Sequence, residues 1–142
     1  MKDAALEYAK NGFKVFPLHD TPSEGMCSCG KNSGEDKCEH QGKHPRTLHG
    51  VNDATTDLNI IKGWWQRYPN ANIGMAMGNG FLAVDIDVKK GAQGKESLKK
   101  LEQEFGVLPE TLMAHTPTGG EHRIFKTDEK FTNRVGVLPG ID

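Results

Sequence analysis

Residues 19–50 form the stretch that most limits how this chain can fold, because they show no apolar periodicity over a long span. They are rich in glycine, serine, cysteine, histidine and lysine. A structureless loop of this length is uncommon inside a compact domain. Something must therefore hold the loop in shape, and it contains all three cysteines of the chain, Cys27, Cys29 and Cys38.

The cysteines lie close to two histidines, and this mixture is typical of metal binding in a reducing compartment. Tetrahedral Zn²⁺ takes four thiolate or imidazole ligands. We expect Cys27, Cys29, Cys38 and His44 to bind a structural Zn²⁺, with His40 as the competing fourth ligand. One residue separates the first two cysteines, which differs from the usual zinc-finger spacing, and thiols without a metal are the alternative.

Composition restricts the class of protein. The chain has 142 residues, a formal net charge of −1 and 17 glycines, which predicts one loop-rich α/β domain. The charge excludes the global basic field of a DNA-coating protein, so any nucleic acid must be bound by local patches. The sequence shows no apolar run of membrane-spanning length and no signal-peptide pattern, so we expect a cytoplasmic protein with no membrane partner.

Apolar spacing and turn residues predict the secondary structure. Three helices are expected, at residues 1–10, from Thr55 or Thr56 to 68, and from about 97 to 105. Strands are expected at 13–16, 72–77, 81–88, 112–116, 122–126 and 135–142. Tight turns at 78–80 and 117–120 predict two hairpins, one between 72–77 and 81–88 and one between 112–116 and 122–126.

The predicted strand 81–88 is apolar until it reaches two acids, Asp85 and Asp87. Residues two apart on a strand point to the same face, with roughly 6.5–7 Å between their Cα atoms. Asp85 and Asp87 should therefore share one face, and Ile86 should lie on the opposite, packed face. Such a pair can bind one Mg²⁺ or Mn²⁺, or share two ions. The alternative is a strand end at which the acids cap a turn or pair with Lys89 and Lys90.

The turn before the strand 122–126 contains Thr118, Gly119 and Gly120, and His122 and Arg123 follow it. Backbone amides at glycines can approach phosphate oxygens closely, and the histidine and arginine add donors. The turn is therefore a candidate nucleotide-binding segment. An ordinary hairpin with a polar strand start is the alternative.

Two other groups could contact nucleic acid. Lys43 and Arg46 could reach phosphates from a zinc-anchored loop, or could be solvated surface residues. Trp64 and Trp65 could stack on bases, but aromatic residues at helical spacing are more often core, and we expect at least one of them in the core.

In this order along the chain, the motifs resemble the bifunctional primase-polymerase domain of the archaeo-eukaryotic primase superfamily. The matching segments are Ala4-Ala5-Leu6 with Gly12, Cys27-Ser28-Cys29-Gly30, Gly42-Lys43-His44-Pro45-Arg46, Asp53-Ala54-Thr55-Thr56, Trp64-Trp65, Asn72-Ile73-Gly74, Asp85-Ile86-Asp87, Leu108-Pro109-Glu110-Thr111, Gly119-Gly120-Glu121-His122 and Leu138-Pro139-Gly140-Ile141-Asp142. Single motifs are weak evidence, whereas their order and spacing together are specific.

The resemblance implies an α+β primase-polymerase fold, with an RRM-like mixed sheet flanked by helices and a zinc-stabilised loop insertion at 19–50 within a catalytic domain at 1–142. It implies that Asp85 and Asp87 bind Mg²⁺ or Mn²⁺, that Asp142 is the third metal ligand, and that His122 contacts the triphosphate. The implied activity is template-directed DNA synthesis from (d)NTPs on single-stranded DNA by a two-metal mechanism.

Relatives in this family continue beyond the last aspartate, so the resemblance also predicts a C-terminally truncated piece of a phage or plasmid replication protein, with a helicase region in the full-length protein. A fragment that ends on its third ligand is expected to be weak or inactive alone. Two other functions remain open from the residues: a non-catalytic, zinc-stabilised module that binds nucleic acid or nucleotides, and a metal-dependent transferase or nuclease.

Overall fold

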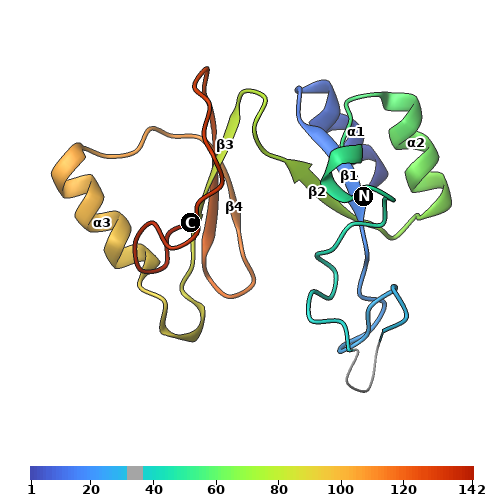
Figure 1. Cartoon of the computed structure of the whole chain (residues 1–142), viewed down its shortest axis with the longest axis horizontal. Helices are drawn as coiled ribbons and strands as arrows, with labels where there is room; N and C mark the ends of the chain where they lie inside the picture. Colours follow the sequence, from blue (N-terminus) through green and yellow to red (C-terminus); the bar gives the residue numbers. More distant parts are fainter. Residues whose placement is uncertain (32–36) are drawn as a thin grey trace. The chain divides into compact units, whose positions relative to one another are not determined.

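The computed structural model describes residues 1–31 and 37–142, and the chain divides into two compact units, Met1–Ala76 and Met77–Asp142. Both units combine helices with antiparallel strands, so the chain is an α+β protein (Figure 1). Part of the predicted 19–50 insertion, at 32–36, lies outside the described residues. Among the helices described, none has the length and apolar character needed to span a membrane.

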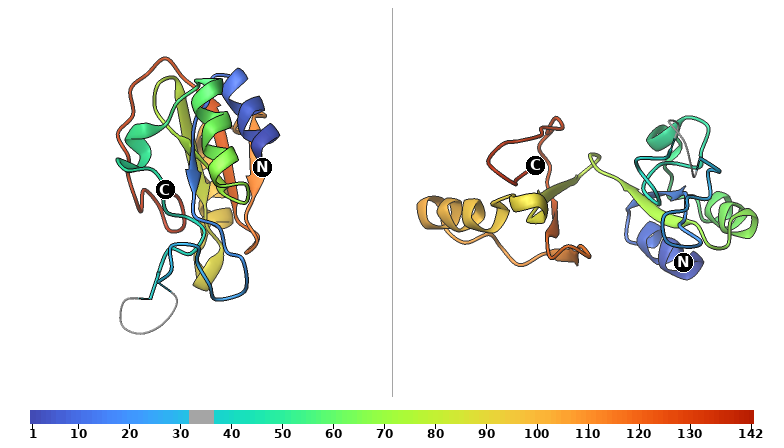
Figure 2. Two further views of the ribbon diagram at one scale, coloured as in Figure 1. Left: turned by 90° about the vertical axis from the view of Figure 1, so that its right-hand side faces the viewer. Right: turned by 90° about the horizontal axis from the view of Figure 1, so that it is seen from below.

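The first unit is built on a two-stranded antiparallel sheet. Strand β1 (Lys14–Leu18) pairs with β2 (Asn72–Ala76), and helices α1 (Lys2–Lys10) and α2 (Leu58–Arg67) contact each other and β1. The two helices lie side by side (Figure 2). Their buried faces meet the strand through fully buried residues that include Ala5, Val15, Ile61 and Trp65.

Helix α2 begins at Asp57 rather than at the predicted Thr55 or Thr56. The Asp57 carboxylate accepts hydrogen bonds from the backbone amides of Asn59 and Ile60, at 2.8 and 3.2 Å, which makes it the N-cap. Thr55 instead accepts a hydrogen bond from the amide of Asp57. The prediction of a core tryptophan is confirmed, because Trp65 is 2% exposed and its indole donates to the carbonyl of Ala71.

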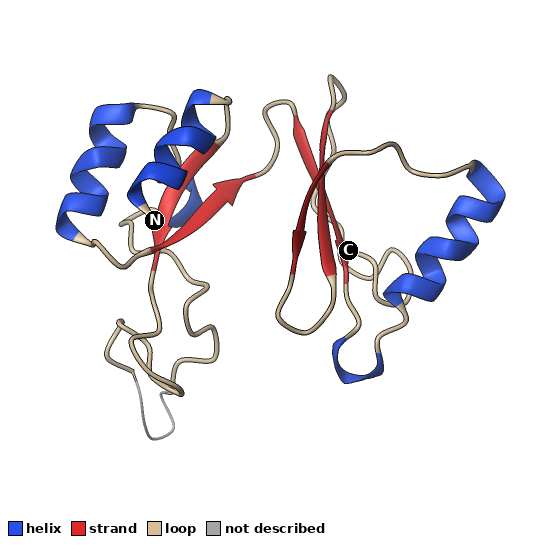
Figure 3. Cartoon of the chain, turned by 180° about the vertical axis from the view of Figure 1, so that it is seen from behind, coloured by secondary structure: helices blue, strands red, loops and turns tan. Residues whose placement is uncertain are grey.

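The second unit is a three-stranded antiparallel sheet with one helix. The strand order is β3 (Phe81–Ile86), β5 (Glu121–Lys126), β4 (Leu112–His115), with β5 in the middle. Figure 3 draws the strands in red and the helices in blue. The predicted hairpin between 112–116 and 122–126 is confirmed as β4–β5. Helix α3 (Gly94–Phe105) starts earlier than the predicted residue 97 and ends, as expected, before Gly106, which has a positive φ of 94°.

Helix α3 covers one face of β3. The core of this unit joins Ile86, Leu98 and Ile141, with Val84 and Leu101 packed against them. Because successive strand residues point to opposite faces, this packing directs Asp85 to the face away from α3. The apolar positions of the strand thus decide where its acid lies.

Two predictions of strand pairing are wrong. The hairpin expected between 72–77 and 81–88 does not form, because β2 pairs with β1 in one unit and β3 pairs with β5 in the other. Only a single bridge, between Gly78 and Phe81, closes that turn. The expected mixed sheet is also not found, since every pair between the described strands is antiparallel.

Candidate functional site

Three carboxylates and a histidine lie in the second unit on neighbouring strands. Asp85 faces His122 in the β3–β5 register. On the other edge of β3, Asp85 and Asp142 exchange both backbone hydrogen bonds, at 2.9 and 3.0 Å. Directly opposed residues of an antiparallel pair share a face of the sheet. Asp142, Asp85 and His122 therefore form a row across three segments, with Asp87 two residues further along β3.

The backbone near Asp87 fixes where the row ends. The amide of Asp87 donates to the carbonyl of Gly140, and the amide of Gly94, at the start of α3, donates to the carbonyl of Asp87. A Cβ on Gly94 would lie 2.5 Å from the carbonyl oxygens of both Asp87 and Gly140. Glycine is therefore needed at 94 and 140, where the end of β3, the start of α3 and the segment before Asp142 approach one another closely. The buried hydroxyl of Ser97 adds a hydrogen bond of 2.7 Å to the carbonyl of Pro139, which holds the segment that carries Asp142.

Two side chains with nitrogen donors approach the acids. The ammonium of Lys89 lies 2.6 Å from Oδ2 of Asp87, and Nε2 of His122 lies 3.3 Å from Oδ1 of Asp85. A hydrogen bond to Asp87, the charge of Asp87, and the charges of Asp85 and Asp142 all raise the pKa of Lys89. All three carboxylates therefore act electrostatically on the ammonium of Lys89, which forms an ion pair with Asp87.

The donor set fits a hard divalent cation. Oxygen ligands are what Mg²⁺ and Mn²⁺ prefer, and the acids are partly exposed, which leaves room for water and substrate oxygens. The side-chain oxygens are not gathered tightly, however. Within the described part of the chain, the one group of candidate ligands whose atoms all lie within 4.8 Å of one another is the Cys/His cluster of the first unit.

The glycine turn is arranged differently from the prediction. The amide of Gly119 donates to the carbonyl of Thr116, and the amide of Gly120 donates to the hydroxyl of Thr116. These two amides are thus used within the turn and do not point freely to a phosphate. Gly120 is needed instead for packing, because a Cβ there would lie 2.6 Å from the carbonyl oxygen of Ile86. The hydroxyl of Thr118, 3.1 Å from that of Thr116, stays at the exposed tip of the turn.

The structure does not bring Arg123 to the acids. Its register partner is Val84, so its side chain lies on the face covered by α3. There it binds Glu121, at 3.0 Å, and approaches Glu102 of α3 at 3.8 Å. Arg123 therefore connects the sheet to the helix, while His122 is the basic residue on the face of Asp85.

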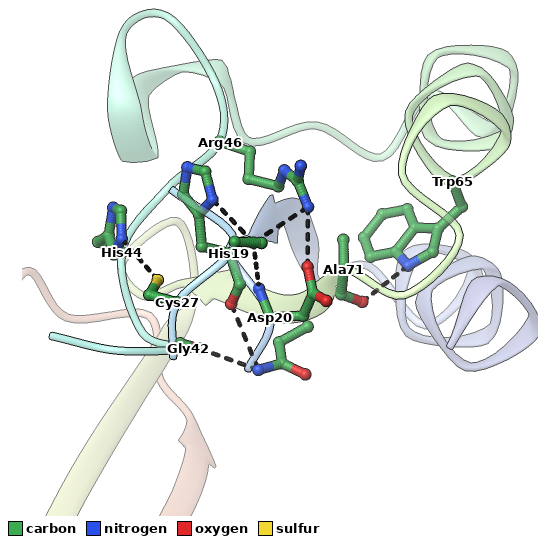
Figure 4. Close-up of polar contacts among 10 residues, drawn as sticks. His19, Asp20, Cys27, Gly42, His44, Arg46, Trp65 and Ala71 are labelled. Carbon is green, nitrogen blue, oxygen red and sulfur yellow. Dashed lines mark hydrogen bonds and ion pairs between the residues drawn. The ribbon is translucent and has the colours of Figure 1, made fainter. Parts of the chain in front are cut away.

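The Cys/His cluster of the first unit comprises Cys27, Cys29, Cys38 and His44, the set expected from the sequence. Cys27 is 1% exposed, and its sulfur lies 3.3 Å from Nε2 of His44 (Figure 4). The alternative ligand, His40, is exposed and is not a member of the cluster. Three sulfurs and one imidazole nitrogen at these separations suit tetrahedral Zn²⁺.

Local hydrogen bonds prepare the buried thiol for a metal. Burial opposes ionisation of Cys27, but hydrogen bonds from the backbone at Cys29 and Gly42, and from His44, outweigh it and lower the pKa to about 6. A thiolate is the form that binds zinc. Burial raises the pKa of Cys38, and the neighbouring sulfurs of Cys27 and Cys29 add to this. Sulfurs that repel one another as thiolates are stabilised together by a shared cation.

A second set of contacts ties the cluster to the sheet. The hydroxyl of Ser28 accepts a hydrogen bond from the amide of Asp20 and contacts Nδ1 of His19, both at 3.0 Å. The ring of His19 stacks on that of His44, with centroids 4.3 Å apart. Burial, followed by the charges of His44 and Arg46, lowers the pKa of His19. A neutral His19 would pack on the His44 imidazole, a candidate ligand, without repelling a bound cation.

Arg46 belongs to the same set of contacts. Its guanidinium binds Asp20 at 2.9 Å, and both ion-pair partners are largely buried (Figure 4). The guanidinium also lies over the ring of Tyr68, 4.1 Å from the centroid. It connects the loop to the end of α2. This arrangement favours a role within the fold over the expected contact with phosphate, whereas Lys43 is exposed.

Sequence reasoning missed the residues that support the acids. The sequence pointed to Ser97 only as the approximate start of a helix, and Gly94 was not singled out, although an isolated glycine can mark a close backbone approach. Lys89 was considered only as part of the alternative in which the acids end a strand. Its spacing, two residues after Asp87, was the available signal.

Comparison with known families gives one match. A family described as bifunctional DNA primase/polymerase, N-terminal, matches residues 5–142, which is nearly the whole chain. No significant match was found among curated proteins or among solved structures.

Proposed function

Since the chain belongs to the bifunctional DNA primase/polymerase family, we propose that its second unit carries the active site of a template-directed DNA primase-polymerase. Family membership implies nucleotidyl transfer, with DNA and nucleotides as substrates. The observation that carries the proposal is the row of Asp142, Asp85 and His122 across adjacent segments, with Asp87 beside it. A row of this kind places acids for cations next to a donor for phosphate.

Each residue in the row has a proposed role. Asp85, Asp87 and Asp142 would hold Mg²⁺ or Mn²⁺, which would neutralise charge on the triphosphate and lower the pKa of the attacking hydroxyl. His122 would donate a hydrogen bond to a triphosphate oxygen once its contact with Asp85 is released. The Thr118 hydroxyl, at the tip of the β4–β5 turn, is a further donor. Arg123 would act only by connecting the sheet to α3.

The Cys/His cluster is proposed to hold a structural Zn²⁺. All four ligands come from the protein, so no position is left for a substrate. The role of such an ion is to organise residues 19–50, whose described part, 19–31 and 37–50, has little secondary structure of its own. Lys43 is the exposed cation on this loop, and we propose it as a phosphate contact for single-stranded DNA or nucleotide. We also propose that the chain belongs to a replication protein that carries a helicase region.

Primer extension tests the proposal. The protein is incubated with Mn²⁺ or Mg²⁺, dNTPs and a primed single-stranded template, and incorporation is followed for Asp85→Asn. Loss of a carboxylate that would hold the charge-neutralising cation is expected to reduce incorporation about 10²-fold or more. Asp128→Asn is the matched control, since Asp128 is exposed and follows the far end of β5. Incorporation by Asp85→Asn at the rate of the control would refute the site.

A second function is favoured by one observation, the contacts of Asp87 with Lys89 and of Asp85 with His122. Acids neutralised by protein side chains suit a module that binds nucleotide or nucleic acid without catalysis. That module would bind dNTP in the presence of Mn²⁺ and would incorporate none under any of the conditions above. Template-dependent incorporation that depends on Asp85 excludes it.

A further inference from the structure

Lys89 forms an ion pair with Asp87, and the charges of Asp85 and Asp142 also act on it. Its ammonium is 2.6 Å from Asp87, and its pKa is raised by Asp87 first and then by Asp85 and Asp142. One positive charge thus faces three negative charges that the backbone holds in fixed positions. Three carboxylates on neighbouring segments of one sheet face repel one another, and a nearby cation lowers that repulsion.

The backbone of Lys89 is fixed while its side chain is free to move. The residue opens a 3-10 turn, Lys89–Gly91, in which the amide of Ala92 donates to the carbonyl of Lys89. Its side chain is 50% exposed, compared with 22% for that of Asp87. The ammonium can therefore leave Asp87 by rotation of the lysine stem, without any change in the strand or the turn.

The carboxylate that Lys89 contacts is also a proposed metal ligand. Oδ2 of Asp87 cannot form a close ion pair with an ammonium and coordinate a divalent cation at full strength at the same time, because both positive charges would share one small volume. His122 has the same relation to Asp85, but at a longer distance of 3.3 Å. Lys89 is therefore the stronger competitor of the two.

We propose that Lys89 is a resident counter-ion, which pairs with Asp87 in the absence of metal and is displaced when a divalent cation binds. Lys89 lowers the repulsion among the three aspartates before metal arrives, and it sets the cation concentration at which the site fills. This inference rests on the proposed function, in which the three acids are the metal ligands.

Mn²⁺ binding tests the inference without measuring catalysis. Free Mn²⁺ is titrated by electron paramagnetic resonance against the zinc-loaded protein in the absence of nucleotide, at low salt. Lys89→Met removes the competing charge and keeps an apolar stem, so Mn²⁺ is expected to bind about three- to tenfold more tightly. The gain is expected to shrink as KCl is raised, because salt screens the partly exposed charges. Lys89→Arg keeps the charge and is expected to bind Mn²⁺ within about twofold of the wild type.

Lys126→Met is the matched control. Lys126 lies on β5 four residues beyond His122, so it faces the same side of the sheet, but its register partner is Phe81 at the far end of β3. The Lys126→Met substitution removes one positive charge, as Lys89→Met does, but it removes no ion pair with Asp85, Asp87 or Asp142. Tightening by Lys126→Met equal to that of Lys89→Met would overturn the inference, since general charge would then explain both.

The two proposals fail in different ways. If Asp85→Asn weakens Mn²⁺ binding but Lys89→Met leaves it unchanged or weaker, the counter-ion is refuted and the metal site stands. If Asp85→Asn binds Mn²⁺ as tightly as the wild type, the acids are not the ligands and both proposals are refuted. Thermal unfolding of each variant shows whether the turn at Lys89–Gly91 still folds, because a merely structural lysine would lower the melting temperature and loosen Mn²⁺ together.

Discussion

The two candidate metal sites of this chain differ in how far they are assembled without an ion. In the first unit, four ligand atoms of the Cys/His cluster lie within 4.8 Å of one another around a buried Cys27. In the second unit, Asp85, Asp87 and Asp142 share a face but are more exposed, and protein cations contact two of them. The Cys/His cluster could fill all four positions around a metal with its own ligands, whereas the aspartates leave space for water and substrate oxygens.

The difference follows from the chemistry of the ligands. Unperturbed thiols are mostly neutral at neutral pH, so the Cys/His cluster carries less charge before a metal arrives than three carboxylates, which are ionised and repel one another, even though the pKa of Cys27 is lowered to about 6. The acids are therefore held apart on a rigid sheet and neutralised by mobile side chains. A closed site suits a structural ion and an open site suits an ion that must also contact substrate.

Removing the zinc ligands is expected to have the largest effect. Cys27→Ser should abolish zinc binding and destabilise the first unit by about several kcal/mol, because residues 19–50 would lose the ion that orders them. Zinc content by mass spectrometry and hydrogen exchange of β1 and β2 provide the measurement. His40→Ala is the control and should retain one zinc. Retention of zinc by Cys27→Ser, or its loss in His40→Ala, would contradict the assigned ligands.

The backbone support of the acids is next in size. Gly94→Ala would place a Cβ against the carbonyls of Asp87 and Gly140, and the clash should cost about 2–3 kcal/mol of unfolding free energy in the second unit. Gly63→Ala, on a helix with open space around it, should instead stabilise the protein by about 0.5–1 kcal/mol. Urea denaturation of the two variants measures both changes. Equal effects of the same sign would show that the three segments do not meet as described.

The hydroxyl of Ser97 has a smaller role in the same support. Ser97→Ala leaves the carbonyl of Pro139 without its hydrogen bond and should cost about 1–2 kcal/mol. The segment that carries Asp142 should loosen, so Mn²⁺ affinity should fall as well. Lys99→Ala, an exposed change on the same helix, is the control for both readouts. A loss of stability with unchanged Mn²⁺ affinity would mean that Asp142 is not a ligand.

The smallest effect is expected at Arg46. Arg46→Lys keeps the charge but loses the planar stack on Tyr68 and the geometry of the pair with Asp20, so about 1 kcal/mol of stability should be lost. Affinity for dNTP, measured by calorimetry, should not change. A fall in that affinity larger than the fall caused by Lys43→Ala would show that Arg46 binds phosphate after all.

The amino-acid sequence predicted those features that depend on local chemistry. The four members of the Cys/His cluster lie within a short span and have side chains that can bind zinc, so this candidate metal site could be predicted without any knowledge of the fold. The glycine at 106 and the β4–β5 hairpin are local in the same sense. Periodicity on strand β3 likewise predicted that Ile86 packs inward while Asp85 faces the other way.

Long-range pairing could not be predicted in the same way. The turn at 78–80 has the residues of a tight hairpin, but turn residues do not determine which strand each flanking segment will join, and β2 and β3 enter different sheets. The place of Asp142 beside Asp85 came from resemblance, because no spacing in the sequence joins residues so far apart. The sequence grouped Arg123 with His122 as nucleotide contacts, whereas the structure places the two on opposite faces of β5, because adjacent residues on a strand face opposite sides.

Anomalous scattering from crystals soaked with Mn²⁺ and dNTP tests the contrast between the closed and the open site most directly. Data collected at the zinc and manganese edges distinguish the two ions at once. The account predicts zinc among Cys27, Cys29, Cys38 and His44, and manganese between Asp85 and Asp87 with Asp142 beside it. Manganese absent from the aspartates, or bound only at other surface acids, would contradict the central claim.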